Sequence, residues 1–422
     1  MAGPAIDHAP VRNRLWPMIG PGLLLAATGV GSGDLATGGI VGSLLGTAVL
    51  WAVLAGALLK YVVTEGLARW QLATGETLLE GAVRRLGPVV IWLFLPYLFF
   101  WSFFVGSAQV SAAGVTLHAI FPVFDDARDG KIVFGIATGL VALALVWFGG
   151  YRLFERVMRA CIAVMFLTVV TTAALLWPGA DEVLTGLFVP RIPDAGGEGL
   201  SWTIALVGGI GGTLTVLCYG YWLREEGRTS PADLPICRLD LATGYLMTAI
   251  FGIAMVIVGS SILVEGEGTE LLVRLAERLE SVLGGFGKWL FLAGTFGAVF
   301  SSVLGVWQAV PYLFADCWAL LERRRGAAPV AVDTTSKPYR IYLLLLAIVP
   351  MLGLFGSFRE VQKIYTVVGA WFFPLLALAV LIFNGRERWV GARFRNGPVS
   401  IAALSAVLLF FSYLAFVDPG AG

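Results

Sequence analysis

An acidic residue, Asp34, lies in the middle of a long apolar run and next to three glycines. The run reads Gly29-Val30-Gly31-Ser32-Gly33-Asp34, and a glycine inside a helix costs up to about 1 kcal/mol relative to alanine. A helix that breaks here would leave carbonyl oxygens near Gly29 and Gly31 free to join the carboxylate in binding a cation. We predict that Asp34 contacts a ligand or a coupling ion; alternatively, it caps the second half of its own helix.

A second glycine-rich break occurs far along the chain. It reads Gly208-Gly209-Ile210-Gly211-Gly212-Thr213 and is followed by Leu214 and by Leu217-Cys218-Tyr219-Gly220. Glycine-interrupted spans at matching positions of two halves are typical of inverted-repeat transporters, whose half-helix ends bind solute at mid-membrane. Close packing through small residues is the alternative.

Lys60 lies near the middle of the next apolar run. We expect its ammonium to snorkel to an interface; the alternative is that it faces the solute path as the ion-pair partner of Asp34. Glu65 and Arg69 have the i,i+4 spacing of a structural pair. The charges of Arg224–Arg228 fit a solvated helix end, or alternatively an inner gate.

Motifs of soluble enzymes are absent from the sequence. It holds no G-x-x-x-x-G-K-[ST] loop for ATP, no H-E-x-x-H and no G-x-S-x-G, and its two histidines are far apart. We therefore expect no enzyme activity, no cofactor and no use of ATP.

The composition places these residues in a membrane. Of 422 residues, 58% are hydrophobic and 14% are charged, whereas soluble proteins carry about 25% charge. The net charge of +1 does not predict nucleic acid as a partner. The four cysteines form no CxxC pair, so neither a disulfide framework nor a zinc site is indicated. The predicted partners are the lipid bilayer and a small cation or other small solute.

Eleven apolar runs are candidates to cross a bilayer as helices, which takes about 20 residues; the ninth, Tyr342–Phe355, is shorter than that. Basic residues concentrate in alternate loops, which places the N-terminus in the cytoplasm and the C-terminus outside, in a plasma membrane or a bacterial-type inner membrane. One transmembrane domain, residues 1–422, would hold two repeats, about 16–178 and 202–383, and an extra helix at about 399–416. The runs are Trp16–Leu45, Ala48–Leu72, Gly87–Phe121, Ile132–Tyr151, Val157–Pro178, Trp202–Leu223, Leu241–Leu263, Trp289–Phe314, Tyr342–Phe355, Ile364–Phe383 and Val399–Phe416.

These spans resemble the Nramp (natural resistance-associated macrophage protein) family of divalent metal transporters over most of the chain. Gly20-Pro21-Gly22-Leu23-Leu24 is similar to the entry of the family's first helix. Ala68-Arg69-Trp70-Gln71-Leu72-Ala73-Thr74-Gly75 is similar to the end of its second, and Ser301-Ser302-Val303-Leu304-Gly305 to a motif of its eighth. The resemblance implies an all-α membrane protein with a leucine-transporter-type 5+5 inverted repeat, an eleventh helix, and broken helices 1 and 6.

The metal-binding motifs of the family are altered in this chain. Gly31-Ser32-Gly33-Asp34 stands where the family has Asp-Pro-Gly-Asn, and Leu217-Cys218-Tyr219 stands where it has Met-Pro-His. An acidic pair tied to the family's proton route falls on Phe100 and Phe103, and a glutamine ligand falls near Thr366. Loss of the thioether favours hard ions such as magnesium or manganese, and loss of the acidic pair argues against the usual proton coupling.

We therefore expect a secondary transporter of a divalent cation that works by alternating access. Its substrate contacts would be Asp34 as the metal ligand, with Gly29, Gly31, Leu214, Leu217, Cys218, Tyr219 and Thr366. One alternative is transport of a small organic solute such as an amino acid or amine, held between Asp34 and Lys60. The other is a membrane sensor that transports nothing.

Overall fold

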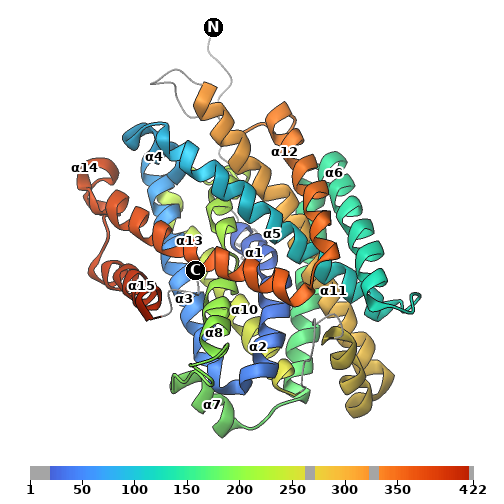
Figure 1. The fold of residues 1–422 in the computed structure, drawn as a ribbon. Helices are drawn as coiled ribbons and strands as arrows, with labels where there is room; N and C mark the ends of the chain where they lie inside the picture. The colour runs from blue at the N-terminus through green and yellow to red at the C-terminus, as the bar shows by residue number, and fades with distance from the viewer. Residues whose placement is uncertain (1–19, 262–270, 323–331, 418–422) are drawn as a thin grey trace, which may run out of the picture.

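The polypeptide folds almost entirely into helices. The computed structural model describes residues 20–261, 271–322 and 332–417 (Figure 1), so the predicted start of the first span at Trp16 lies outside the described residues. In chain order the helices are α1 (Pro21–Gly29), the π-helical η2 (Val30–Thr37), α2 (Gly38–Leu45), η3 (Gly46–Val49), α3 (Leu50–Thr74), α4 (Leu78–Leu86), α5 (Val89–Ile120), α6 (Ala127–Leu175), α7 (Ala180–Phe188), α8 (Gly199–Gly209), η4 (Leu214–Cys218), α9 (Tyr219–Glu225), η5 (Pro231–Asp233), α10 (Leu234–Ser260), α11 (Leu271–Glu322), α12 (Lys337–Ile348), η6 (Val349–Phe355), α13 (Phe358–Gly385), α14 (Glu387–Val390), η7 (Ala392–Phe394) and α15 (Pro398–Val417).

Eight helices in the described part of the chain are long and apolar enough to cross a membrane. Two of them cover more than one predicted span. α6 has 49 residues and would be about 74 Å long if it were straight, more than twice the roughly 30 Å hydrocarbon core; Gly150, with φ +63°, divides it. The stretch Asp34–Thr74 turns in the same way at Gly46, where φ is +65°. Each predicted span therefore falls mainly on helix, although the start of the first span and the end of the seventh, at Leu263, lie outside the described residues and the sixth is interrupted between Gly209 and Leu214.

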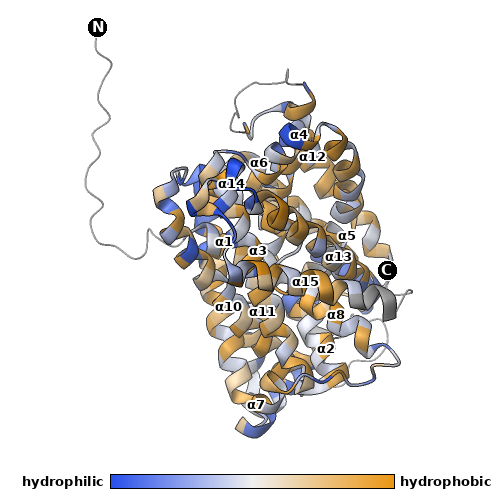
Figure 2. Ribbon diagram, turned by 90° about the vertical axis from the view of Figure 1, so that its left-hand side faces the viewer, coloured by the Kyte–Doolittle hydropathy of each residue, from blue (hydrophilic) through white to orange (hydrophobic). Residues whose placement is uncertain are grey.

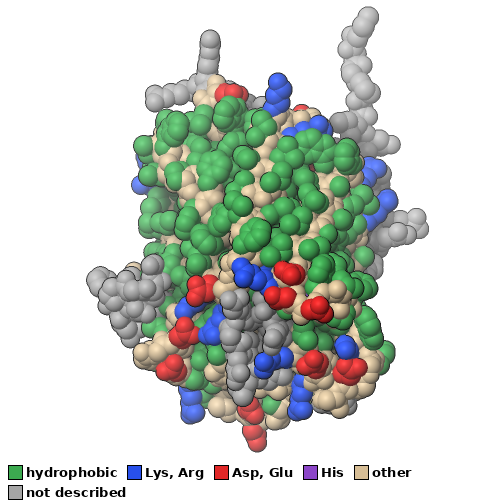
Figure 3. Space-filling model, turned by 45° about the vertical axis from the view of Figure 1, so that its right-hand side comes forward, with side chains coloured by type: hydrophobic (Ala, Val, Ile, Leu, Met, Phe, Trp, Pro, Cys, Tyr) green, Lys and Arg blue, Asp and Glu red, His purple; other side chains and the backbone are tan. Residues whose placement is uncertain are grey.

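The surface of the bundle is apolar along most of its length. Figure 2 shows hydrophobic residues along the helices and hydrophilic ones mainly toward the two ends. On the face drawn in Figure 3, hydrophobic side chains cover a broad band, with charged side chains gathered below it and at its upper margin. α4 and α14 lie at one end and α7 at the other (Figure 1). We call the end that carries α4 and α14, with Arg84 and Arg386, the basic end.

The helices that carry the two glycine-rich breaks lie inside the bundle. In the most apolar window of Gly199–Glu225, 83% of residues are buried, against 22% for the window in α6. α1 is buried at every position except Leu23 and packs against α10 and α11. A helix that is apolar on all sides belongs in the interior, so these two helices form the centre of the fold.

Candidate functional site

The sixth span is interrupted for four residues. α8 ends at Gly209, and Ile210 takes φ −52° and ψ +124°. Gly211 and Gly212 follow with φ +72° and +85°, a left-handed conformation that glycine adopts without steric cost. Thr213 then precedes η4 and α9. Backbone N–H and C=O groups in this stretch must find partners outside their own helix.

The first span leaves the helical conformation at one residue, Gly31, with φ −61° and ψ −117°. Gly29 lies directly against the interruption of the sixth span. A Cβ atom added at Gly29 would come within 2.5 Å of the Gly211 carbonyl carbon and of the Gly212 nitrogen. Only a glycine permits this approach, so the glycines here bring the two interruptions face to face.

The Asp34 carboxylate joins the two interrupted helices. Asp34 lies in η2, and its side chain is fully buried. The Gly211 N–H donates to its two oxygens, at 3.0 Å and 3.3 Å. These hydrogen bonds come from the backbone of the other interrupted helix and not from the second half of its own helix.

Lys60 reaches the same place from α3. It is 1% exposed, and its ammonium donates to the carbonyl oxygens of Gly208, at 2.6 Å, and of Ile210. It also interacts electrostatically with Asp34 and lies 5.2 Å from the centre of the Phe373 ring. The expectation that Lys60 snorkels to an interface is therefore wrong. Its ammonium satisfies the carbonyls that the end of α8 leaves free.

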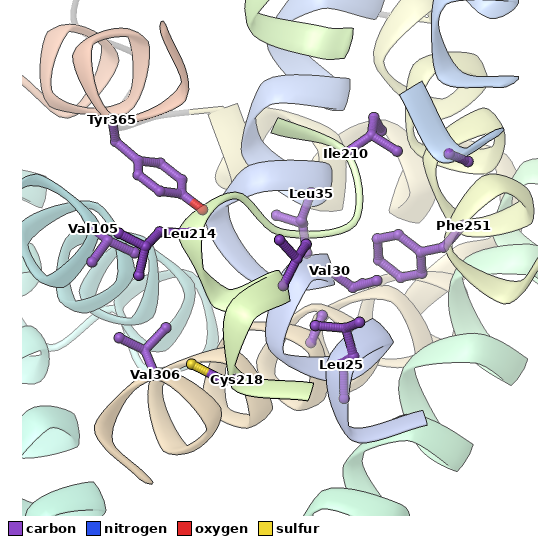
Figure 4. Packing of buried hydrophobic residues seen from close by; sticks show 14 of the residues in the cluster. Leu25, Val30, Leu35, Val105, Ile210, Leu214, Cys218, Phe251, Val306 and Tyr365 are labelled. Carbon is purple, nitrogen blue, oxygen red and sulfur yellow. The ribbon is translucent and has the colours of Figure 1, made fainter. Parts of the chain in front are cut away.

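Hydroxyl and aromatic side chains surround this pair, and sequence reasoning missed them. The Trp101 indole donates to the Thr213 hydroxyl at 2.8 Å, and Tyr365 interacts with the same hydroxyl. Figure 4 shows the Tyr365 hydroxyl pointing toward the segment that carries Leu214, among apolar side chains. The hydroxyls of Tyr245 and Thr64 lie 2.7 Å apart. Aromatic residues in apolar runs carry no sequence signal that separates a lipid-facing position from a central one.

The predicted contacts around η4 divide into two groups. Leu214 is buried beside the interruption, and Leu217 is partly exposed. The Cys218 thiol lies 3.5 Å from the Ala309 carbonyl oxygen of α11 and points toward Val306 in Figure 4. The Tyr219 hydroxyl donates to Asp240 at 3.0 Å. Cys218 and Tyr219 are thus bound to other partners and do not join Asp34.

The remaining predicted positions, Gly31 and Thr366, lie against other parts of the bundle. A Cβ atom at Gly31 would overlap Ser302 and Gln109. The Thr366 hydroxyl donates to Gln362 and Lys363 carbonyls of its own helix, at 2.9 Å and 3.0 Å. The predicted pair of Glu65 and Arg69 is confirmed, at 3.3 Å.

Few side chains around Asp34 could act as metal ligands. Among the residues that the structure describes, no group of three or more His, Cys, Asp or Glu side chains is placed to hold one. Asp34 offers a carboxylate, and Gly208 and Ile210 offer carbonyl oxygens, but the Lys60 ammonium is bound to those carbonyls. A cation could use all three oxygen sources only after Lys60 moves away.

Comparisons with known proteins agree with this architecture. A sequence model of the family described as natural resistance-associated macrophage protein-like matches residues 22–417. An uncharacterized protein of Pasteurella multocida is 25% identical over 412 residues, 93% of this chain and 91% of that protein. The divalent metal cation transporter MntH of Chromohalobacter salexigens is 27% identical over 257 residues, 60% of this chain and 57% of MntH.

Two solved structures share the fold. A manganese transporter of Eremococcus coleocola has a TM-score of 0.74 at 16% identity, covering 97% of this chain and 88% of that chain. MhsT in complex with L-phenylalanine has a TM-score of 0.59 at 16% identity, covering 95% and 98%. At these identities the likeness establishes the fold alone, which is the leucine-transporter-type arrangement of membrane helices. With the family match over nearly the whole chain, this protein belongs to the Nramp family of integral membrane transporters.

Proposed function

We propose that this protein is a secondary transporter that moves a divalent metal cation across the membrane by alternating access. The family and the relatives named as divalent metal cation transporters support the substrate class. The observation that carries the mechanism is the Asp34 carboxylate, which is held by the Gly211 N–H of the other interrupted helix. A movement of one half-helix relative to the other would break this contact and free the carboxylate.

The ligands released by such a movement are all oxygen atoms. Asp34 would contribute its carboxylate, and Gly208 and Ile210 would contribute carbonyls once Lys60 withdraws. Oxygen ligands suit hard ions, whereas thioether and thiolate sulfur select softer ones. The Cys218 thiol faces α11, so a magnesium-like or manganese-like ion fits this site best.

The orientation that we propose is supported by the basic end. Retention of Lys and Arg on the cytoplasmic side would place α4 and α14 there, with the N-terminus cytoplasmic and the C-terminus external, in a plasma membrane or a bacterial-type inner membrane. The two repeats, about residues 16–178 and 202–383, would rock against each other around Asp34.

Transport of a small organic solute is the second candidate, and the position of Lys60 favours it. An amino acid could place its ammonium at Asp34 and its carboxylate at Lys60, replacing the contacts that these two side chains make now. The pair is neutral as a whole, so a zwitterion leaves the buried charge balanced, whereas a bare divalent cation adds two positive charges.

Uptake into proteoliposomes tests the proposal. Purified protein would be reconstituted around a fluorescent indicator, and Mn²⁺ or Mg²⁺ influx measured for the wild type, for Asp34→Asn and for Asp129→Asn, whose exposed carboxylate lies outside the site. Of the two variants, we expect only Asp34→Asn to lose influx, in protein that is still folded at the temperature of the assay. Undiminished influx in Asp34→Asn would remove Asp34 from the mechanism.

Thermal-shift screening separates the two candidates. A ligand that binds only the folded state raises its apparent stability. Stabilisation by Mn²⁺ or Mg²⁺ supports the cation. Stabilisation by amino acids or amines, lost when Lys60 and Asp34 are both neutralised, supports the organic solute instead.

A further inference from the structure

A second buried carboxylate, Asp316, lies at the basic end, far from Asp34 in the sequence and in a different cluster. It belongs to α11 and is fully buried. Its Oδ2 accepts from the Tyr221 hydroxyl at 2.6 Å and from the Thr77 hydroxyl at 3.3 Å. Its Oδ1 is buried without a hydrogen-bond partner. Leu79 and Ile91 form a small apolar cluster with Cys317, the next residue of α11.

A second acid, Glu80, meets Asp316 at Thr77. Thr77 caps α4: its hydroxyl accepts from the Glu80 N–H at 3.1 Å, and its own N–H donates to Glu80 Oε2 at 2.7 Å. The same hydroxyl donates to Asp316, and the two carboxyl groups interact electrostatically. Two carboxylates therefore share one small, largely dry space.

The positive charges nearby do not balance both acids. Arg224 pairs with Glu80 at 2.6 Å. Arg84 and Arg85 pair with Glu76, the next acid along the chain. Within the described residues, no Lys, Arg or His lies within salt-bridge distance of Asp316. Asp316, Glu80 and Arg224 together carry one excess negative charge if both acids are ionised.

A buried, uncompensated charge is more costly than a buried neutral group that lacks one hydrogen bond. When two carboxylates share a site, one of them holds a proton. We propose that Asp316 and Glu80 form a proton-binding site, with one proton on Asp316 while α9 is seated against α11. With that proton, the three groups sum to zero charge.

The position of α9 decides whether water reaches this site. The groups that face Asp316 are Tyr221 and Arg224 of α9, Thr77 and Glu80 at the start of α4, and Cys317 on its own helix. If α9 moves away, water reaches the cluster; the O–H bond of Asp316 breaks, the proton passes to that water, and a hydrated carboxylate remains. Proton binding thus favours the seated position of α9, and proton release accompanies its departure.

Infrared spectroscopy of the purified full-length protein in lipid tests the proton directly. A protonated carboxyl group has a carbonyl stretch separate from that of a carboxylate. At neutral pH we expect the protonated-carboxyl band in the wild type. The part of the band that comes from Asp316 should be lost completely in Asp316→Asn. Glu80→Gln should lose the same band, because Arg224 is then free to balance Asp316.

Asp240→Asn is the matched control. Asp240 is also fully buried, but it accepts from the Gly20 and Gly22 N–H groups, from Tyr219 and from Arg228, which favour its ionised form. The band should persist in this variant. If folded Asp316→Asn and Glu80→Gln both keep the wild-type band, the shared proton is ruled out; if Asp316→Asn fails to fold, Glu80→Gln alone decides.

Hydrogen exchange measures the link to α9. One proton released per opening changes the opening equilibrium by up to about tenfold per pH unit. After correction for intrinsic exchange, the protection of Tyr219–Glu225 should fall with rising pH in the wild type and stay constant in Asp316→Asn. An identical pH dependence in both would refute the link. The proposal rests on the proposed function only for the movement of α9. Neither the infrared band nor the hydrogen exchange requires a transported substrate, so a failure of cation uptake would not contradict either result.

Discussion

The interruptions of the first and sixth spans contribute different chemistry to the centre of the molecule. The sixth opens over Ile210–Thr213, with two left-handed glycines. Side chains from other helices take up its free groups: Lys60 binds two of its carbonyls, and Asp34 binds one N–H. The first departs from helical geometry at Gly31 alone and continues as a π-helix to Thr37. The sixth therefore supplies backbone groups, and the first supplies a carboxylate.

As a result, internal partners already occupy the carbonyls and the carboxylate of this site. The Lys60 ammonium lies where a cation would meet the carbonyls, and the Gly211 N–H lies where a cation would meet the carboxylate. In the proposed mechanism, the transported substrate would have to displace these internal partners. The variants below test each side of that arrangement.

The largest effect is expected from Lys60→Met. The variant leaves Asp34 buried without its cation and leaves the Gly208 and Ile210 carbonyls without a donor. Leaving a buried charge uncompensated costs about 3–5 kcal/mol, so we expect a large fall in the apparent Tm in detergent.

The double variant Lys60→Met with Asp34→Asn is the control for this pair. It removes both charges and keeps an acceptor for the Gly211 N–H, so most of the stability should return. A double variant as unstable as the sum of the two single variants would show that the two side chains act independently.

A smaller effect is expected from Gly29→Ala, which tests the contact between the two interruptions. The new Cβ atom would lie 2.5 Å from backbone atoms of Gly211 and Gly212, and backbone cannot move aside as a flexible side chain does. Overpacking of this kind costs about 1–3 kcal/mol, and uptake should fall with stability.

Gly385→Ala is the matched substitution, because no atom lies within 4 Å of its added Cβ and its φ is not left-handed. It should leave stability and uptake unchanged, or raise stability slightly. Equal behaviour of the two alanine variants would mean that the interruptions do not depend on close approach.

The spans and the location of both interruptions could be predicted from the sequence. The length of an apolar run indicates a membrane-spanning helix, and a cluster of glycines indicates where that helix is interrupted. The sequence was not enough for the partners of Lys60, which lie 148 and 150 residues further along the chain. The prediction that the Lys60 ammonium reaches an interface was wrong because the sequence of an apolar helix does not show which side faces the centre of the bundle. Tyr219 was misplaced for a related reason: each residue turns a helix by about 100°, so one position at the start of α9 directs its hydroxyl to Asp240.

The smallest effect is expected from two buried threonines, Thr213 in the sixth interruption and Thr366 in α13. Thr213→Val removes the acceptor of the buried Trp101 N–H, and an unsatisfied buried donor costs about 1 kcal/mol or somewhat more. Thr366→Val removes a hydroxyl that bonds only to carbonyls of its own helix, so stability should change by less than about 0.5 kcal/mol.

Uptake measured over a range of substrate concentrations then distinguishes the roles of the two threonines. Thr213→Val should lower the maximal rate by loosening the interruption, whereas Thr366→Val should alter the KM only if Thr366 contacts the transported substrate. An unchanged KM in Thr366→Val, at unchanged stability, would remove Thr366 from the site and leave Asp34 and the carbonyls of the sixth span as its ligands.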